Sequence, residues 1–408
     1  MVRDDLVLEP GTRLLHIGPH KTGTTAVQGA FHLARERLAA QGVVYPARGR
    51  QPLLAALAVT GQPGLLGGAC PGMVCWDKLI RDVCAAGSQR VVVSSEFFAC
   101  ADDATARRVV EDLGGRGRVQ IVVTLRPLTS IIPSQWQQYL QNGYCFPYLE
   151  WLEGILSEPP RTPTPGFWRR HRHDELITRW VAAAGARNLT VIVVHESDRL
   201  MLLRTFEALL GLPRGFLSPD ERAANRSLTL AEAEVVRLLN EEFKRRGWPN
   251  RNYARFMRHG AVEQMKTGRQ PAPDEPKIVT PAWALKRAAQ IGAEMADNIL
   301  ALGVRVVGDI SALGNIPADL PDAAADATLT APLIPAEAAA QAIVGGLVAG
   351  GVADQMTEAD KRRAAADRLV RDVDAKDLGR VLVKRGRQRV RRALRLRRQD
   401  RHPQALAT

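Results

Sequence analysis

The sequence has no apolar segment long enough to cross a membrane. Its strongest apolar runs, such as Val91–Val93 and Val191–Val194, are short, whereas a spanning helix needs about 20 residues. The longest stretch of small apolar residues, Ala342–Ala353, is glycine-rich and also too short. The first ten residues lack the apolar core of a signal peptide. These absences predict a cytoplasmic protein without a transmembrane segment.

Cysteine is scarce, and its spacing fits neither a disulfide framework nor a zinc module. The chain has 5 cysteines, an odd number, and no second closely spaced pair follows Cys70 and Cys75. A structural zinc site needs two such pairs or a pair with histidines. We therefore expect reduced thiols and no metal site.

Most of the chain has almost no net charge. The formal charge of +13 comes mainly from residues 361–408, which hold 17 Lys+Arg and 5 Asp+Glu. Residues 1–360 are left with 39 basic and 38 acidic residues. A tail of this kind suits RNA, DNA or acidic lipid surfaces, or is simply a solvated extension. The basic pI therefore does not make the fold itself a nucleic-acid binder.

Continuous apolar runs alternate with helical patterns along residues 1–312. The runs predict strands at 14–17, 91–96, 119–125 and 189–194, with a short last strand at 304–307. Strands of this kind, separated by helices, indicate an α/β fold of three layers, in which helices flank a central parallel sheet. We expect residues 157–168 to form a loop over the site and residues 247–280 to be irregular.

The composition changes after this domain. Residues 313–335 are rich in Ala, Pro and Asp and predict a linker. Residues 336–408 form an Ala/Arg-rich C-terminal extension, helical or partly disordered, with expected helices at 336–348 and 357–371.

Residues 13–31 have the pattern strand, short loop, helix. Gly18 and Gly23 keep the glycine spacing of a nucleotide-binding P-loop. That loop places a lysine directly after the second glycine, where this chain has Thr24, and Lys21 lies inside the loop instead. Backbone N–H groups and a helix N-terminus can still bind an anion here. The lysine that spans the β- and γ-phosphates of a triphosphate is missing.

Two further strands end in polar residues. Ser94, Ser95 and Glu96 follow the second long strand, and Thr124 and Arg126 end the third. Because ligands of open parallel sheets bind at the carboxyl ends of the strands, we expect these ends and the Lys21 loop to meet in one crevice.

Together these motifs resemble the bacterial-type members of the PAPS-dependent sulfotransferases, whose donor is 3′-phosphoadenosine 5′-phosphosulfate (PAPS). The first donor loop of that family reads roughly P-K-[ST]-G-[ST]-[ST], and Pro19–Thr25 is similar, with His20 as one extra residue. The second family motif is an Arg at a strand end and a Ser eight positions later, as in Arg126 and Ser134. The resemblance covers about residues 12–310.

The resemblance implies a P-loop-like fold, sulfuryl transfer to a hydroxyl or amine, and no metal. It implies that Arg126 and Ser134 hold the 3′-phosphate and that Lys21 acts on the leaving phosphate. The residues expected at the 5′-phosphosulfate come from the first loop: His20, Lys21, Thr22, Gly23, Thr24 and Thr25. The base of the family is a His or a Glu, and Glu96 is our candidate, with His20 as competitor.

Other interpretations of these residues remain open. Glu96 could be a helix-start carboxylate, Ser134 a helix cap and Arg126 an ion-pair partner. The segment Lys266–Arg269 matches weakly a basic segment that helps to hold the 3′-phosphate in several branches of the family. We expect His171 and His173 to lie in a solvated loop, because their spacing is poor for a metal on a helix.

Two other classes of function compete with sulfuryl transfer. A P-loop kinase would bind Mg-ATP and need a carboxylate for magnesium at a strand end. A binding protein would act through its basic tail. The acceptor of a transferase, which could be a small molecule, a carbohydrate or a lipid, would bind among loops such as 47–75 and 143–172. The sequence leaves the acceptor and the oligomeric state open.

Overall fold

The structure is a computed structural model. It describes residues 6–64, 68–161, 164, 166–195, 197–198, 200–220, 226–318, 320 and 333–350. The chain divides into two compact units, Met1–Gly346 and Leu347–Thr408. The fold described below is that of the first unit. The expected helix at 357–371 and most of the expected linker at 313–335 lie outside the described residues.

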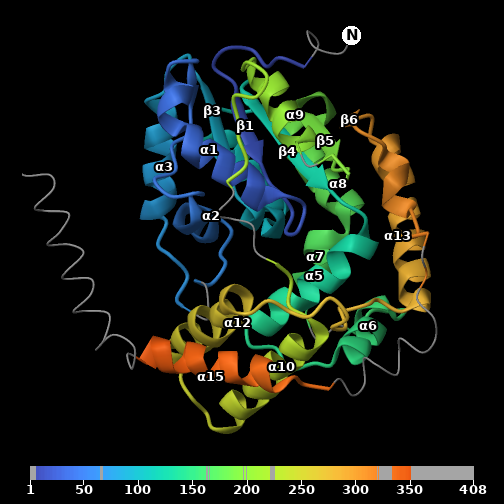
Figure 1. The fold of residues 1–408 in the computed structure, drawn as a ribbon. Helices are drawn as coiled ribbons and strands as arrows, with labels where there is room; N and C mark the ends of the chain where they lie inside the picture. The colour runs from blue at the N-terminus through green and yellow to red at the C-terminus, as the bar shows by residue number, and fades with distance from the viewer. Residues whose placement is uncertain are drawn as a thin grey trace, which may run out of the picture. The chain divides into compact units, whose positions relative to one another are not determined.

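A parallel sheet lies at the centre of the first unit (Figure 1). Its order is β2-β3-β1-β4-β5-β6, and each pair of neighbours is parallel. The strands are β1 (Arg13–His16), β2 (Val43–Val44), β3 (Arg90–Ser94), β4 (Val119–Leu125), β5 (Leu189–Val193) and β6 (Arg305–Val307). The four long runs of the sequence are thus strands, as predicted, and β1 lies between β3 and β4.

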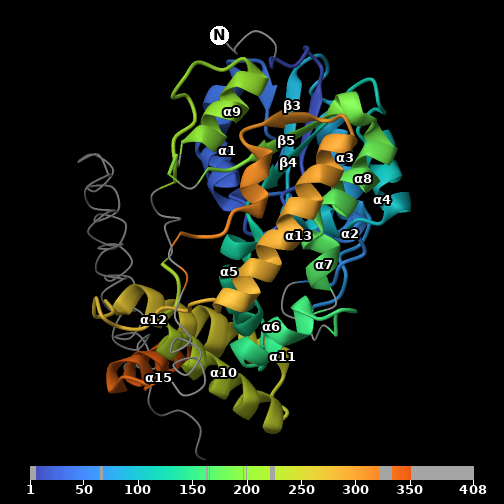
Figure 2. The same cartoon turned by 90° about the vertical axis from the view of Figure 1, so that its right-hand side faces the viewer.

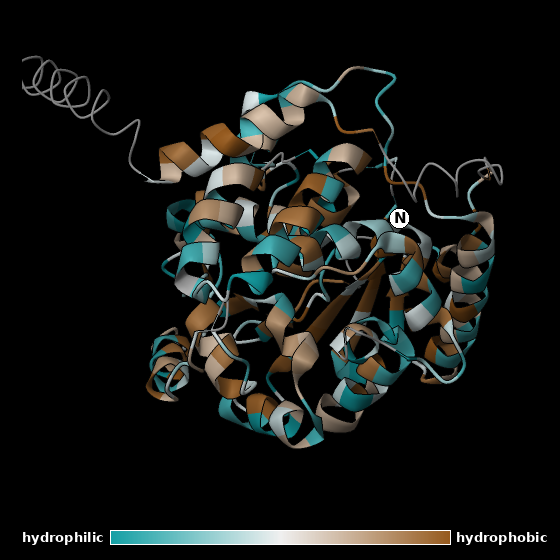
Figure 3. Cartoon of the chain, turned by 90° about the horizontal axis from the view of Figure 1, so that it is seen from below, coloured by the Kyte–Doolittle hydropathy of each residue, from teal (hydrophilic) through white to brown (hydrophobic). Residues whose placement is uncertain are grey.

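The strands are apolar on both faces because helices cover both faces. Leu15, Val93 and Ile121 belong to one buried cluster, and Leu14 and Val92 belong to another. Successive side chains of a strand point to opposite faces, so a continuous apolar run needs two covering layers. In Figure 3, where hydrophobic residues are brown, the strands at the centre are mostly brown.

One face of the sheet packs against α1 (Thr24–Ala39) and α9 (Met201–Leu210). The other face packs against α3 (Val74–Cys84), α4 (Asp103–Asp112), α8 (His173–Ala184) and part of α13 (Ala282–Ala301). Figure 2 shows α13 running past α8. This is the predicted three-layer, P-loop-like arrangement.

A second group of helices follows the carboxyl ends of the strands and has its own core around Trp136, Trp151 and Met265. It lies below the sheet in Figure 1. Its members are α5 (Leu128–Gln141), α6 (Tyr148–Leu156), α7 (Gly166–His171), α10 (Leu230–Arg245), α11 (Asn250–Asn252), the π-helix η5 (Tyr253–Val262), α12 (Glu263–Gly268) and α15 (Ala336–Gly350). The remaining short elements are α2 (Leu53–Val59), η2 (Glu96–Cys100), η3 (Ala186–Asn188) and η6 (Ile310–Gly314).

Two segments expected to be loops are partly helical. Residues 250–268 form α11, η5 and α12, so the prediction of an irregular segment over 247–280 is wrong for this part. Met257, Ala261 and Met265 recur at helical spacing and are buried there, whereas the arginines and glycines around them obscure the pattern in the sequence. Within 143–172, α6 and α7 are helices as well. The expected helix at 336–348 is confirmed as α15.

Among the described helices, none is long and apolar enough to span a membrane.

Candidate functional site

The loop between β1 and α1 turns sharply, and its glycines are required by geometry. Gly18, Lys21 and Gly23 have φ values of 78°, 67° and 94°, in the left-handed region. A Cβ on Gly18 would lie 3.0 Å from the Cα of Glu96, and a Cβ on Gly23 would lie 2.7 Å from Cδ2 of Leu202. The glycine spacing of the sequence therefore reflects close approaches of the backbone.

The N-terminus of α1 has the features of an anion-binding helix terminus. Gly23 is its N-cap, no side chain caps it, and its first turn holds no acidic residue. The first N–H groups of a helix have no partner within the helix, and the helix dipole favours negative charge beside them. Thr24, which is buried, and Thr25, which is exposed, begin the helix and offer hydroxyl groups at the same place.

A chain of buried hydrogen bonds fixes this loop to the sheet. The Thr22 hydroxyl donates to the Pro19 carbonyl at 2.6 Å and lies 2.8 Å from the Thr124 hydroxyl. Nε2 of His16 lies 3.1 Å from the Thr124 hydroxyl, and Nδ1 of His16 lies 2.8 Å from the Ser94 hydroxyl. The chain joins β3, β1 and β4 to the loop.

The direction of this chain follows from counting protons. The Thr22 hydroxyl donates its only proton to Pro19, so the Thr124 hydroxyl donates either to Thr22 or, at 3.3 Å, to the carbonyl of Gly18. In either case His16 donates from Nε2 to Thr124, and Nδ1 accepts from Ser94 when the ring is neutral. Burial lowers the pKa of His16 to about 3, which keeps the ring neutral. The sequence analysis missed His16, although it faces Ser94 in the register of β1 and β3.

Lys21 is part-buried and belongs to a group of cations. Its Nζ donates to Oε1 of Gln138 at 3.1 Å. Its pKa is lowered to about 8, first by burial and then by the nearby charges of Lys266 and Arg258, while the carboxylate of Glu96 opposes the shift. Like charges held close together in a half-buried place indicate a site for an anionic ligand. Lys266 belongs to the segment that weakly matches a basic 3′-phosphate segment of the family, whereas no pattern in the sequence indicates that Arg258 approaches Lys21.

Arg126 connects the loop to a cavity. Its Nη1 donates to the carbonyl of Lys21 at 3.4 Å. It also lines a cavity of about 850 Å³ together with Ser134, Ser130 and Lys277. This volume is within the usual range for ligand sites, about 300–1,000 Å³. The structure thus brings Arg126 and Ser134 to one cavity beside the loop. Ser134 lies inside α5, which starts at Leu128, so it is not the cap of that helix.

An ion-pair network supports one wall of this cavity. Arg226 donates to both oxygens of Glu232 at 2.6 and 2.7 Å, and Arg269 donates to Glu232 at 3.0 Å and to Glu275 at 2.9 Å. Arg269 is buried and its guanidinium is bonded to carboxylates, so it stabilises the wall without lining the cavity. The segment that follows it presents Lys277, which sequence analysis missed, to the cavity.

Glu96 lies on the other side of the loop. It begins η2 at the end of β3, directly after the N-cap Ser95. Oε2 accepts from Nε2 of Gln28 at 2.9 Å, and Oε1 accepts from Nε2 of Gln51 at 3.4 Å. Amide donors orient a carboxylate without neutralising it. Because its backbone touches Gly18, Glu96 is placed against the same loop as Lys21.

His20 is the second candidate base. Its ring lies edge-on to Phe97, with 5.2 Å between the ring centroids. Nδ1 is buried and has no hydrogen-bond partner among the described residues. Burial, followed by the charges of Arg170 and Lys21, lowers the pKa of His20 well below its usual value. His20 is therefore a neutral imidazole within the loop.

The prediction that His171 and His173 lie in a solvated loop is wrong. Both side chains are fully buried, at the end of α7 and the start of α8. Burial lowers the pKa of both rings, to about 4 for His173. The two residues flank the junction of two helices, which brings both of them into the interior although they are two positions apart.

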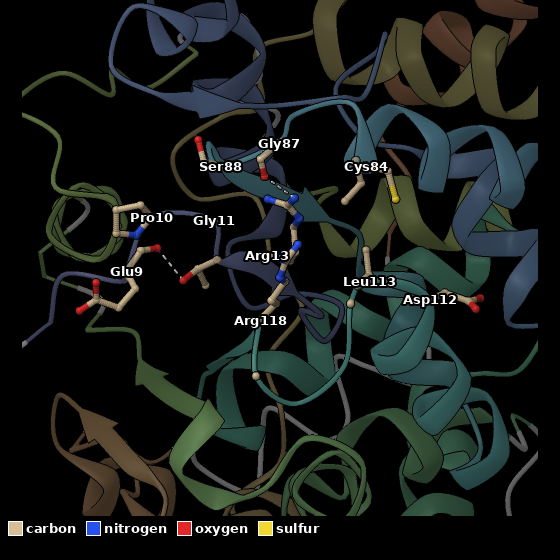
Figure 4. A pocket seen from close by; sticks show the side chains of 14 residues that line it. Glu9, Pro10, Gly11, Arg13, Cys84, Gly87, Ser88, Asp112, Leu113 and Arg118 are labelled. Atoms are coloured by element: carbon tan, nitrogen blue, oxygen red, sulfur yellow. Dashed lines mark hydrogen bonds between the residues drawn. The ribbon is translucent and has the colours of Figure 1, made fainter.

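A second cavity, of about 560 Å³, lies at the amino ends of β1 and β4 (Figure 4). Arg13 enters it, but its two Nη atoms donate to the carbonyls of Gln89 at 2.8 Å and Gly87 at 2.9 Å. This arginine therefore holds the backbone together. The cavity is at the opposite end of β1 from the Lys21 loop and takes no part in the site.

The described residues contain no group of three or more His, Cys, Asp or Glu side chains that could hold a metal ion. The groups that meet around the loop and the Arg126 cavity are cations, hydroxyls, amides and carboxylates, of which Glu96 lies at the loop while Glu275 is paired with Arg269. Such a set can bind an extended anion and accept one proton.

No model of a protein family matches the chain, and no curated protein matches it. Among solved structures, the chain is similar to the crystal structure of a sulfotransferase from Alicyclobacillus acidocaldarius. The sequence identity is 16%, the match covers 58% of this chain and 95% of that chain, and the TM-score is 0.37. At this TM-score the likeness supports no conclusion about function, which has to come from the residues of this chain.

Proposed function

We propose that the protein is a sulfotransferase that moves a sulfuryl group from PAPS to a hydroxyl or amine. One observation supports this proposal: two places suited to an anion are joined by the hydrogen bond from Arg126 to the carbonyl of Lys21. One is the loop with the α1 N-terminus, and the other is the cavity lined by Arg126 and Ser134. PAPS carries two separate anionic groups, the 5′-phosphosulfate and the 3′-phosphate. A nucleoside triphosphate carries only one.

The loop would hold the 5′-phosphosulfate. Lys21 supplies a cation, and Thr24 and Thr25 supply hydroxyls at the helix start. The Thr22 hydroxyl is already bonded to Pro19 and Thr124, so Thr22 contributes through the backbone and by holding the loop in shape. Gly23 gives the backbone room to turn, and His20 flanks the anion.

Arg126 and Ser134 would hold the 3′-phosphate. A guanidinium can bind a phosphate with two parallel hydrogen bonds, and a serine adds a shorter donor. Lys277 lines the same cavity and adds positive charge. Arg226 also lines it, but its guanidinium is engaged by Glu232.

The reaction would be an in-line displacement at sulfur. The acceptor oxygen forms a bond to sulfur while its proton passes to Glu96, and the bond between sulfur and the bridging oxygen of the 5′-phosphate breaks. Lys21 neutralises the charge that develops on the leaving phosphate. The products are the sulfated acceptor and 3′-phosphoadenosine 5′-phosphate, and Glu96 returns its proton to water. Amide donors from Gln28 and Gln51 keep the carboxylate in place as the base.

Calorimetry with 3′-phosphoadenosine 5′-phosphate, AMP and ATP-Mg tests the donor assignment. We expect tight binding of the bisphosphate, weaker binding of AMP because the Arg126 cavity stays unused, and no requirement for magnesium. Lys286→Gln, an exposed lysine outside the site, is the control and should bind like the wild type. Tight binding of ATP-Mg without binding of the bisphosphate would contradict the proposal and favour a kinase.

A further inference from the structure

Helix α15 exposes its large apolar side chains. Ile343 and Val344 are 63% and 40% exposed. The same helix buries its small residues, such as Ala342. A helix on the surface of a globular protein normally does the opposite, because its apolar stripe faces the core.

Close packing against η5 determines this orientation. A Cβ on Gly345 would lie 2.4 Å from the carbonyl oxygen of Gly260, so only glycine allows the two backbones to approach this closely. Glu337 accepts from Nε of Arg269 at 3.3 Å, and Gln341 accepts from Gln264 at 3.1 Å. A seam of small residues and two polar contacts thus hold the helix with its large residues outward.

The exposed face of α15 lacks the charged side chains that usually make a helix surface hydrophilic. From Ala338 to Gly350 the helix has no charged residue. In Figure 3, α15 is the helix at the upper left, and much of it is coloured as hydrophobic. Residues 351–360 hold three acidic residues and no basic one, and the sequence is strongly basic after them, with 17 Lys+Arg and 5 Asp+Glu from Lys361 onward. An apolar helical face followed by basic sequence is a combination that binds the interface of an anionic bilayer.

We propose that α15 docks on an anionic lipid surface, with the basic sequence after it binding the head groups. Charge favours this occupant over a second copy of the chain. Two copies meeting at this face would bring together two segments with a net charge of +12 each, whereas anionic lipids would neutralise them. Because no described helix can span a membrane, the protein would lie at the interface. This inference is independent of the proposed sulfuryl transfer.

Co-sedimentation of the full chain with vesicles tests the inference. One set of vesicles contains phosphatidylcholine alone, and the other also contains phosphatidylglycerol. The variant Ile343→Ser/Val344→Ser removes apolar area from α15, and Leu238→Ser/Leu300→Ser removes it from exposed sites on α10 and α13 that are 43% and 54% exposed. We expect binding only to the anionic vesicles. The α15 variant should lower the affinity about tenfold or more, and the control should not change it.

A second variant tests whether the basic sequence after α15 contributes to lipid binding. Changing Arg391, Arg392, Arg395, Arg397 and Arg398 to Gln should reduce the salt dependence of binding. Equal binding by the α15 variant and its control would overturn the role of α15. A dimer in solution that the α15 variant dissociates would assign the face to a second copy and would also overturn the proposal. So would a lower Tm of the α15 variant with unchanged vesicle binding, because the face would then be covered by the chain itself.

Discussion

The two ends of strand β1 each adjoin a cavity that contains an arginine, but the two ends differ in what their cations bind. At the amino end, both Nη atoms of Arg13 donate to backbone carbonyls. At the carboxyl end, Lys21 contacts a neutral amide oxygen, and Lys266 and Arg258 lie near enough to lower its pKa. The comparison teaches that a cavity with an arginine is not by itself a ligand site. A group of cations close enough to lower the pKa of one of its members is the better sign.

The largest effect should come from the carboxylate at the functional end. Glu96→Gln keeps the shape of the side chain but removes the base, so sulfuryl transfer should fall by about 10³-fold, within the range of general-base catalysis. Affinity for 3′-phosphoadenosine 5′-phosphate should not fall, and isothermal calorimetry would measure it. The matched variant is His20→Asn. If His20→Asn abolishes turnover and Glu96→Gln does not, the base is His20.

The next effect compares the two arginines directly. Arg126→Gln should weaken the binding of 3′-phosphoadenosine 5′-phosphate by about tenfold or more, because a charge-assisted contact to the 3′-phosphate is lost. AMP, which lacks that phosphate, should bind the variant and the wild type alike.

Arg13→Gln is the matched substitution at the other end of β1. It should lower Tm, because two part-buried backbone carbonyls lose their donor, but it should leave the affinities for the bisphosphate and for AMP unchanged. If Arg13→Gln and Arg126→Gln weakened the binding of the bisphosphate equally, the two ends of β1 would not differ in function.

The fold and the centre of the site could be predicted from the sequence for a simple reason. A buried parallel strand is a continuous apolar run, and the carboxyl ends of such strands meet at one edge, so the Lys21 loop, Glu96 and Arg126 could be placed together. Contacts set by tertiary packing could not be predicted. Arg258 and Lys266 reach Lys21 from a segment that was expected to be irregular, and its helical pattern is broken by arginines and glycines.

Buried polar residues were the other source of error. His16 stands in a strand without any local pattern, and its role depends on Ser94 and Thr124 of neighbouring strands. His171 and His173 were expected in solvent because a sequence does not show that two helices join between them. Burial of a histidine depends on the packing of distant elements, which periodicity does not reveal.

The pH dependence of nucleotide binding is another property in which the two ends of β1 should differ. The pKa of Lys21 is lowered to about 8 in the free protein, and an anion on the loop favours the charged form. Binding should therefore be strongest below pH 8 and should weaken as pH rises through 8, by up to about tenfold at pH 9. Above pH 8 the protein should take up a proton on binding, which calorimetry in buffers of different ionisation enthalpy can detect.

Lys21→Met removes the titrating group and is the control for this measurement. The variant should bind the bisphosphate weakly, with no proton uptake between pH 7 and 9. An unchanged pH profile in the variant would show that another group, such as Lys266, controls binding. Arg13 does not titrate in this range, so Arg13→Gln should keep the wild-type profile.

The smallest effect concerns the hydrogen-bond chain that fixes the loop. His16→Asn breaks the chain between Ser94 and Thr124, so the free energy of unfolding should fall by about 1–3 kcal/mol. The affinity for 3′-phosphoadenosine 5′-phosphate should also fall, by about fivefold, because binding must then order the loop. The control is Thr190→Val, which removes another buried bond of the same sheet, from Gln120 to Thr190.

Measuring Tm and the affinity for 3′-phosphoadenosine 5′-phosphate together distinguishes a role in positioning the loop from a role in general stability. Thr190→Val should lower Tm and leave the affinity unchanged, because its bond lies far from the loop along the strands. Thr22→Val should resemble His16→Asn, while Thr22→Ser, which keeps the hydroxyl that bonds to Pro19 and Thr124, should restore the affinity. If His16→Asn lowers Tm without changing the affinity, the chain stabilises the sheet but does not hold the loop in its binding shape.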